Sequence, residues 1–299
     1  MKEHTALSKC TLVTSWILTS LGLCSTASML AVRILSRGTQ LRVEDVLVPL
    51  SFLLAAALIA LSTWAIASEG QGSHQDDISV SQVDRVAKSL LVSEALWSLI
   101  NGLIRISACI FLHRIFDPVP WARRALTALA VFSGLLAVAS ILQIFLICRP
   151  FAANWDHKVL GACGDQMASF MAFEALGLAL DVVIVAVPTW LVLTMRNMAF
   201  GKRVMLMVVF DVGIIVIVVT GLRMGALYKT VDEDFTYSQS YLSLLSAAGT
   251  MTAIVCCASP IFPQVYNDTW LNTFNAEDPD GSLSDDAEGK RGFTSRSSI

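Results

Sequence analysis

The stretch VLVPLSFLLAAALIALSTWAIA, Val46–Ala67, contains no charged residue. A helix of about 20 mostly apolar residues is long enough to cross the hydrocarbon core of a bilayer. The whole chain follows this pattern, because 55% of its 299 residues are hydrophobic, only 15% are charged, and the mean hydropathy is +0.65. A soluble domain of this size shows more polar surface to water than such a composition allows. The sequence therefore predicts an integral membrane protein.

Seven segments have the length and composition of a spanning helix. Lipid offers the backbone no hydrogen-bond partner, so each segment should be helical. We expect an all-α, seven-transmembrane-helix bundle over residues 1–266, with the lipid bilayer as its surroundings. The predicted spans are Thr11–Val32, Val46–Ala67, Ser89–Leu112, Ala125–Cys148, Met167–Met195, Val204–Leu227 and Ser240–Val265.

Lys and Arg residues in the loops predict the orientation, since cytoplasmic loops carry the excess. One side holds twelve of them and the other seven. The richer side should be cytoplasmic, which places the N-terminus outside. The membrane itself is expected to be either the plasma membrane or an endomembrane. The first span could instead be a signal peptide, but the basic residues directly behind it favour a cytoplasmic loop. The richer side consists of Arg33, Arg37, Arg42, Arg114, Arg123, Arg124, Arg196, Lys202, Arg203, Lys290, Arg291 and Arg296.

Residues 267–299 differ from the rest of the chain because they are rich in Ser, Gly, Asp and Glu and poor in apolar residues. Such a segment cannot bury enough apolar surface to fold. We expect a disordered cytoplasmic tail, which either binds a cytoplasmic partner or only keeps this end soluble. Asn267-Asp-Thr269 is a glycosylation acceptor that should stay bare in the cytoplasm, so a glycan on Asn267 would reverse the predicted orientation.

Six ionisable residues interrupt the predicted spans. Each costs about 2.5–3.5 kcal/mol on insertion scales, so they should face the bundle interior and find partners. One interpretation is that they only join helices. The other is a polar pocket that opens outward and binds a small, largely apolar molecule with a few polar groups. The candidates, with one asparagine from the polar stripe of the third span, are Glu94, Asn101, Arg105, Glu174, Asp181, Asp211 and Arg223.

Depth in the membrane predicts which of these residues pair. A lone buried charge is much more expensive than a paired one, so each arginine should find a carboxylate at its own level. Four carboxylates face two arginines, so at least one carboxyl is left over for a ligand contact or for acid catalysis. We expect this to be one of the two near the outer mouth, Glu94 or Glu174. The predicted pairs are Arg105 with Asp211 or Asp181, and Arg223 with Glu94 or Glu174.

Two of the seven cysteines, Cys148 and Cys163, flank a loop predicted to face the outside, where the compartment is oxidising. Closing this loop would stabilise it by about 3 kcal/mol in the chain-entropy model. Only Cys10 competes as an outer cysteine, so we expect a Cys148–Cys163 disulfide, with two unpaired thiols as the alternative. The cysteines and the four histidines show no metal-ligand spacing, so no metal is predicted. A net charge of −3 without a basic cluster gives no reason to expect nucleic acid.

A set of short motifs occurs in the order of a known family. In chain order they are Glu44-Asp45, LWSLINGLIRIS at 96–107, HRIF at 113–116, CRPFAANW at 148–155, GACGD at 161–165, Asp181, Pro188, Lys202, Arg223 and SPIFP at 259–263. The ordered set resembles the fungal rhodopsin-like integral membrane protein family, which includes the satratoxin-cluster membrane protein and appressorial receptor-like proteins. The resemblance covers residues 15–265.

The resemblance implies seven helices, a fungal source and frequent location in secondary-metabolite gene clusters. The family often carries Trp and Glu in the seventh helix, where this chain has Ser246 and Gly249, and Lys in the third, where it has Arg105. No retinal cofactor is expected, because Ser240–Val265 contains no lysine to form a Schiff base. Three functions stay open: a membrane component of a toxin or other secondary-metabolite cluster, a ligand-sensing receptor, and a membrane-embedded cyclase or hydratase that uses intramembrane carboxylates.

Overall fold

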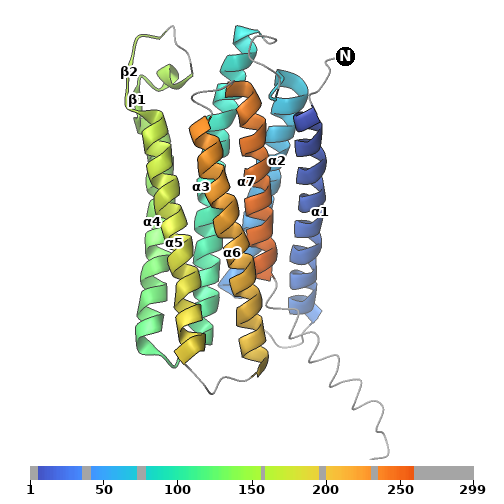
Figure 1. The fold of residues 1–299 in the computed structure, drawn as a ribbon, viewed down its shortest axis with the longest axis vertical. Coiled ribbons are helices and arrows are strands. Elements are labelled where there is room, and N and C mark those ends of the chain that lie inside the picture. Colours follow the sequence, from blue (N-terminus) through green and yellow to red (C-terminus); the bar gives the residue numbers. More distant parts are fainter. Residues whose placement is uncertain are drawn as a thin grey trace, which may run out of the picture. The chain divides into compact units, whose positions relative to one another are not determined.

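The computed structural model describes residues 6–35, 42–72, 79–155, 159–194, 200–229 and 235–258 (Figure 1). These residues form seven long helices, as predicted. They are α1 (Ala6–Leu35), α2 (Val43–Trp64), α3 (Val80–Ile115), α4 (Pro120–Leu146), α5 (Gln166–Thr194), α6 (Phe200–Lys229) and α7 (Phe235–Ala258). The short elements are η1 (Ala65–Glu69), β1 (Cys148–Arg149), η3 (Phe151–Asn154) and β2 (Ala162–Cys163).

Six of these helices are long and apolar enough to cross a bilayer, and α6 contributes the shorter apolar segment Gly213–Tyr228. Their outward faces carry large exposed apolar side chains such as Leu53, Val131 and Trp190. Contiguous apolar surface is unfavourable in water and favourable in lipid. The chain is therefore a multi-pass membrane protein.

Successive helices run in opposite directions, so the connections alternate between two ends of the bundle (Figure 1). We call the end with Cys148 and Cys163 the disulfide end, and the end with Arg114 and Arg123 the basic end. Helix α3 packs against α2, α4, α5 and α7, whereas α1 packs on α2 and α7, and α6 packs on α5 and α7. Helix α7 also packs on four helices, namely α1, α2, α3 and α6. An internal site is most readily built around α3 and α7, because each of them is surrounded by other helices.

Helix α3 is longer than the predicted span Ser89–Leu112, since it begins at Val80 and ends at Ile115. Ser79 and Gln82 form a capping box at its start, in which the Ser79 backbone N–H donates to Gln82 Oε1 at 3.1 Å. Such a cap satisfies the first backbone donors without any tertiary contact. The polar residues 80–88, expected in a connection, are therefore helical and lengthen α3 at the disulfide end.

Small residues bring α3 and α4 close together. A Cβ atom added to Gly102 would lie 2.7 Å from the Ala137 Cβ, so no larger residue fits there without a shift of the helices. The nearby Ser133 is fully buried and donates its hydroxyl to the Leu129 carbonyl, one turn back. Small residues at such contacts let membrane helices approach closely. This contact forms one wall of the site described below.

The predicted disulfide is confirmed, since Cys148 and Cys163 are bonded and their Cα atoms lie 4.1 Å apart. Strands β1 and β2 pair antiparallel with the two cysteines opposite each other. The loop between them packs on itself and on α3, because the Trp155 ring lies 5.0 Å from the Phe151 ring and 5.1 Å from Lys88 Nζ. The loop is thereby held against the disulfide end of the bundle.

Several predictions concern residues outside the described part of the chain. The predicted seventh span reaches Val265, whereas the described part of α7 ends at Ala258. The tail 267–299, with its glycosylation acceptor Asn267, also lies outside the described residues. The boundary at residue 266, the tail and the orientation in the membrane all stay predictions.

Candidate functional site

The most buried charge described in the bundle is Arg223 on α6, whose exposed fraction is 0%. Its Nη2 atom donates to Glu94 Oε1 on α3 at 2.5 Å, and its Nη1 atom lies 2.5 Å from Glu174 Oε1 on α5. Glu94 is 6% exposed. The predicted choice between the two carboxylates was therefore too narrow, because one arginine binds both.

Two uncharged side chains complete the surroundings of Arg223. Its Nε atom donates to Ser246 Oγ on α7 at 2.9 Å, and its guanidinium carbon lies 4.2 Å from the centre of the Trp97 ring. The Trp97 Nε1–H donates to Glu174 Oε1 at 2.8 Å. We call these five residues, Glu94, Trp97, Glu174, Arg223 and Ser246, the Arg223 cluster. It joins α3, α5, α6 and α7 at one level of the bundle.

A second buried ion pair joins α3 and α5, further toward the basic end than the Arg223 cluster. Arg105 on α3 donates from Nε and Nη2 to the two carboxylate oxygens of Asp181 on α5, at 2.7 and 2.9 Å. Such a two-point contact is the strongest form of an arginine–carboxylate pair. Gly177 makes room for it, since a Cβ atom there would lie 2.9 Å from Arg105 Nη2. Of the two predicted partners of Arg105, the structure therefore selects Asp181.

A cavity of about 30 Å³ lies between α3, α4 and α5 and connects the two arginine sites. A water molecule needs about 10–15 Å³ of such volume, so the cavity has room for about two or three. Asn101 lines it and donates its side-chain amide to the Trp97 carbonyl at 2.8 Å. The lining residues are Glu94, Trp97, Ser98, Asn101, Arg105, Leu136, Ala137, Ser140, Phe170, Phe173, Glu174 and Gly177.

Six of the seven candidate site residues thus come together. Four line the cavity and the other two, Asp181 and Arg223, bind residues of its wall. Asp211 was wrongly expected in the bundle interior, because it is exposed and has no hydrogen bond or ion pair with another described residue. It lies 12 positions before Arg223, which places it about 120° around α6 from that residue.

Two buried carboxylates at the basic end, each paired with an arginine, were not predicted as a site. Glu44 and Asp45, in the first turn of α2, are almost completely buried. Arg114 on α3 donates to the two Glu44 oxygens at 2.5 and 2.9 Å, and Arg33 Nε on α1 donates to Asp45 Oδ1 at 3.0 Å. We call these four residues the basic-end pairs. Two adjacent acidic residues at the start of a span that is flanked by arginines are a sequence pattern that could have revealed them.

The described residues offer no group of three or more His, Cys, Asp and Glu side chains arranged to hold a metal ion. The contacts within the Arg223 cluster are ion pairs and hydrogen bonds. Glu94 accepts a hydrogen bond from the Arg223 guanidinium, and Glu174 accepts one from the Trp97 indole N–H and forms an ion pair with Arg223. Ser246 donates its hydroxyl to the Leu242 carbonyl at 2.9 Å. The carboxylate oxygens of such a site can accept further hydrogen bonds from a polar group that carries N–H or O–H donors.

Comparison with known proteins agrees with the fold and with the motifs. The model of the fungal rhodopsin domain matches residues 29–268, which include α2 to α7 and the end of α1. The chain is also similar to the wortmanamides biosynthesis cluster protein C of Talaromyces wortmannii, at 24% identity over 263 residues, which cover 87% of this chain and 71% of that protein. The region that matches the family model, residues 29–268, contains the Arg223 cluster and the basic-end pairs. The chain belongs to the fungal rhodopsin domain family.

Proposed function

We propose that the protein is a membrane component of a fungal secondary-metabolite biosynthetic cluster, and that the Arg223 cluster binds the polar group of a small, largely apolar molecule. The similarity to a protein named for a wortmanamides biosynthesis cluster supports the first part. The observation that carries the second part is that Glu94 and Glu174 share a single arginine.

The charges around the cavity do not balance. Arg105 and Arg223 bring two positive charges, whereas Glu94, Glu174 and Asp181 bring three negative ones when all are ionised. An unpaired charge in the membrane interior is costly. A molecule that presents a hydroxyl, an amide N–H or a protonated amine to Glu94 or Glu174 would lower this cost, so the site favours a donor or cationic group over an acid.

The cavity also supplies apolar walls for the rest of such a molecule, since Leu136, Phe170 and Phe173 line it. Its volume of about 30 Å³ holds water only, because pockets for small molecules measure about 300–1,000 Å³. Binding therefore requires α3, α4 and α5 to separate.

The disulfide-end loop is the part whose movement would open the site outward. Trp155 packs against a buried apolar cluster that includes Leu91, Ile144 and Phe170. Phe170 also belongs to the cavity wall. A shift of Trp155 would therefore loosen the wall beside Glu174 without breaking the disulfide.

Deletion of the gene in the producing fungus tests the proposed role. The amount or the location of the product of the neighbouring biosynthetic genes should change, and wild-type protein should restore it. A chain with Glu174→Gln should not restore it, whereas Asp211→Asn, which removes a carboxyl from the exposed face of α6, should do so.

Three results would contradict the proposal. One is a gene neighbourhood without biosynthetic genes, which would favour the receptor. Another is substrate turnover by microsomes that contain the protein and no other cluster product, which would favour the enzyme. The third is complete restoration of the product by the Glu174→Gln chain.

A further inference from the structure

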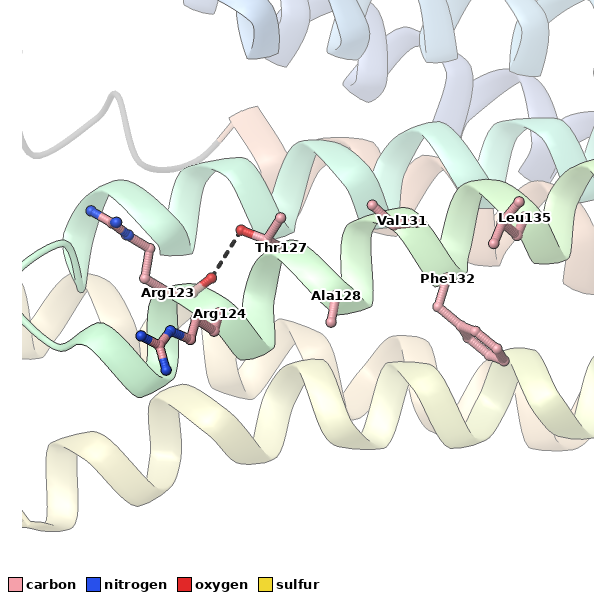
Figure 2. Close-up of a pocket in the computed structure, with 7 residues that line it drawn as sticks. All are labelled: Arg123, Arg124, Thr127, Ala128, Val131, Phe132 and Leu135. Carbon is pink, nitrogen blue, oxygen red and sulfur yellow. Dashed lines mark hydrogen bonds between the residues drawn. The ribbon is translucent and has the colours of Figure 1, made fainter.

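A second hollow lies on the outer face of α4, away from the Arg223 cluster (Figure 2). Its volume is about 580 Å³, and it is a shallow hollow that is widely open to the surroundings of the helix. Thr127 does not need a ligand there, because its hydroxyl donates to the Arg123 carbonyl at 2.9 Å. The hollow is lined by Arg123, Arg124, Thr127, Ala128, Val131, Phe132 and Leu135.

The lining changes in character along α4. Two arginines stand at the start of the helix, and exposed apolar side chains follow over the next three turns. Figure 2 shows the Arg124 guanidinium and the Phe132 ring directed to the same side of α4, with only the short Ala128 side chain between them. The hollow thus has a cationic end, a gap over Ala128 and an apolar end.

Both arginines are available to a ligand. Arg124 has no hydrogen bond or ion pair with another described residue, and Arg123 has only a 3.7 Å contact with Asp117 in which both side chains are more than half exposed. An exposed ion pair of this kind contributes little, about 0–1 kcal/mol. A guanidinium binds phosphate oxygens at two points, so a phosphate group competes readily for these side chains.

Exposed tryptophans indicate where this end of α4 lies in the bilayer. Trp121, in the first turn of α4, is 50% exposed, and Trp190, near the same end of α5, is 66% exposed. Tryptophan is enriched at the membrane–water interface. Arg123 and Arg124 therefore lie at headgroup level, and the apolar part of the hollow lies along the acyl chains.

We propose that this hollow binds an anionic phospholipid, with its phosphate on Arg124 and on an Arg123 side chain turned toward it, and with one acyl chain over Ala128, Phe132 and Leu135 (Figure 2). The side on which it opens is the one that the loop charges predict to be cytoplasmic. Anionic lipids are concentrated in the cytoplasmic leaflet, where they attract basic residues. The site is independent of the proposed role of the Arg223 cluster.

Native mass spectrometry of the full chain, released from phosphatidylcholine nanodiscs with and without phosphatidylserine, tests this site. The wild-type chain should retain phosphatidylserine in preference to phosphatidylcholine. Replacing both arginines (Arg123→Gln with Arg124→Gln) should weaken retention about thirtyfold, which corresponds to about 1 kcal/mol for each basic residue. Ala128→Phe, which fills the gap and changes no charge, should also weaken it. All of these residues face lipid, so folding should be unaffected.

The matched control removes equal charge from the same side of the bundle, at the start of α6, by Lys202→Gln with Arg203→Gln. Retention should then be as in the wild type. An equal loss in this control would overturn the site, because it would show that only the total charge matters. Retention unchanged by Ala128→Phe, equal retention of phosphatidylcholine, or displacement of the lipid by inorganic phosphate alone would each overturn it as well.

Discussion

The Arg223 cluster and the basic-end pairs both consist of buried carboxylates that are paired with arginines, but they differ in their charge balance. At the basic end each carboxylate has an arginine of its own, Glu44 with Arg114 and Asp45 with Arg33. In the Arg223 cluster two carboxylates share one arginine. Balanced pairs are sufficient to join helices. An excess carboxylate inside a membrane protein destabilises the fold, so the joining of helices does not account for its presence. Under the proposed function, the basic-end pairs serve stability and the Arg223 cluster serves binding.

The largest expected effect is that of removing the shared arginine. Arg223→Met leaves two carboxylates buried without a cation, and loss of one partner of a buried pair typically costs about 3–5 kcal/mol. The free energy of unfolding of the purified chain in detergent should fall by this amount. A loss below about 1 kcal/mol would show that the two carboxylates do not depend on Arg223.

Removal of an arginine at the basic end should have a smaller effect. Arg114 is 41% exposed, so water can reach the Glu44 carboxylate when Arg114→Met removes its partner. An unsatisfied polar group of this kind costs about 1–3 kcal/mol. The same unfolding measurement should therefore rank Arg114→Met below Arg223→Met, and the reverse order would contradict the comparison.

Neutralising a single carboxylate should change the free energy of unfolding differently in the two regions. Glu94→Gln or Glu174→Gln removes the excess charge and leaves Arg223 paired with the other carboxylate, so stability should stay within about 1 kcal/mol of the wild type or rise. Glu44→Gln breaks a balanced pair and should lower the free energy of unfolding by about 1–2 kcal/mol. If all three variants lose the same stability, the Arg223 cluster is a structural pair like the others.

The smallest effect is expected for Asp211→Asn. No partner of Asp211 is lost among the described residues, and a neutral side chain on the exposed face of α6 is easier to accommodate in lipid. Stability should be unchanged or slightly higher in the unfolding measurement. A loss above about 1 kcal/mol would instead place Asp211 in a contact with another part of the chain.

The sequence predicts the parts of this structure that depend on the cost of exposing a residue to lipid. That cost belongs to each segment separately, so the seven spans can be recognised one by one. The same reasoning works for Arg105 and Arg223, because a charge at a known depth must find a partner at that depth. The Cys148–Cys163 pair is predictable since few cysteines compete on one side of the membrane.

The remaining features depend on how each helix is rotated about its own axis. Helix α6 is apolar on all sides, so no polar face indicates that Arg223 points inward and Asp211 outward. The sharing of Arg223 by α3 and α5 follows from the packing of three helices, which no single span encodes. Glu44 on α2 likewise pairs with Arg114 on α3, and the sequence of neither helix alone predicts that these two residues are in contact.

Binding by the purified chain tests most directly whether the excess carboxyl contacts a ligand. The product of the neighbouring biosynthetic genes should bind to the wild-type chain in nanodiscs at one equivalent per chain. Glu94→Gln or Glu174→Gln should weaken this binding about tenfold or more, which is the loss of one hydrogen bond to a charged group, whereas Glu44→Gln should leave the dissociation constant unchanged. Equal binding by all four chains, or binding by none of them, would contradict the assignment of the Arg223 cluster as the binding site.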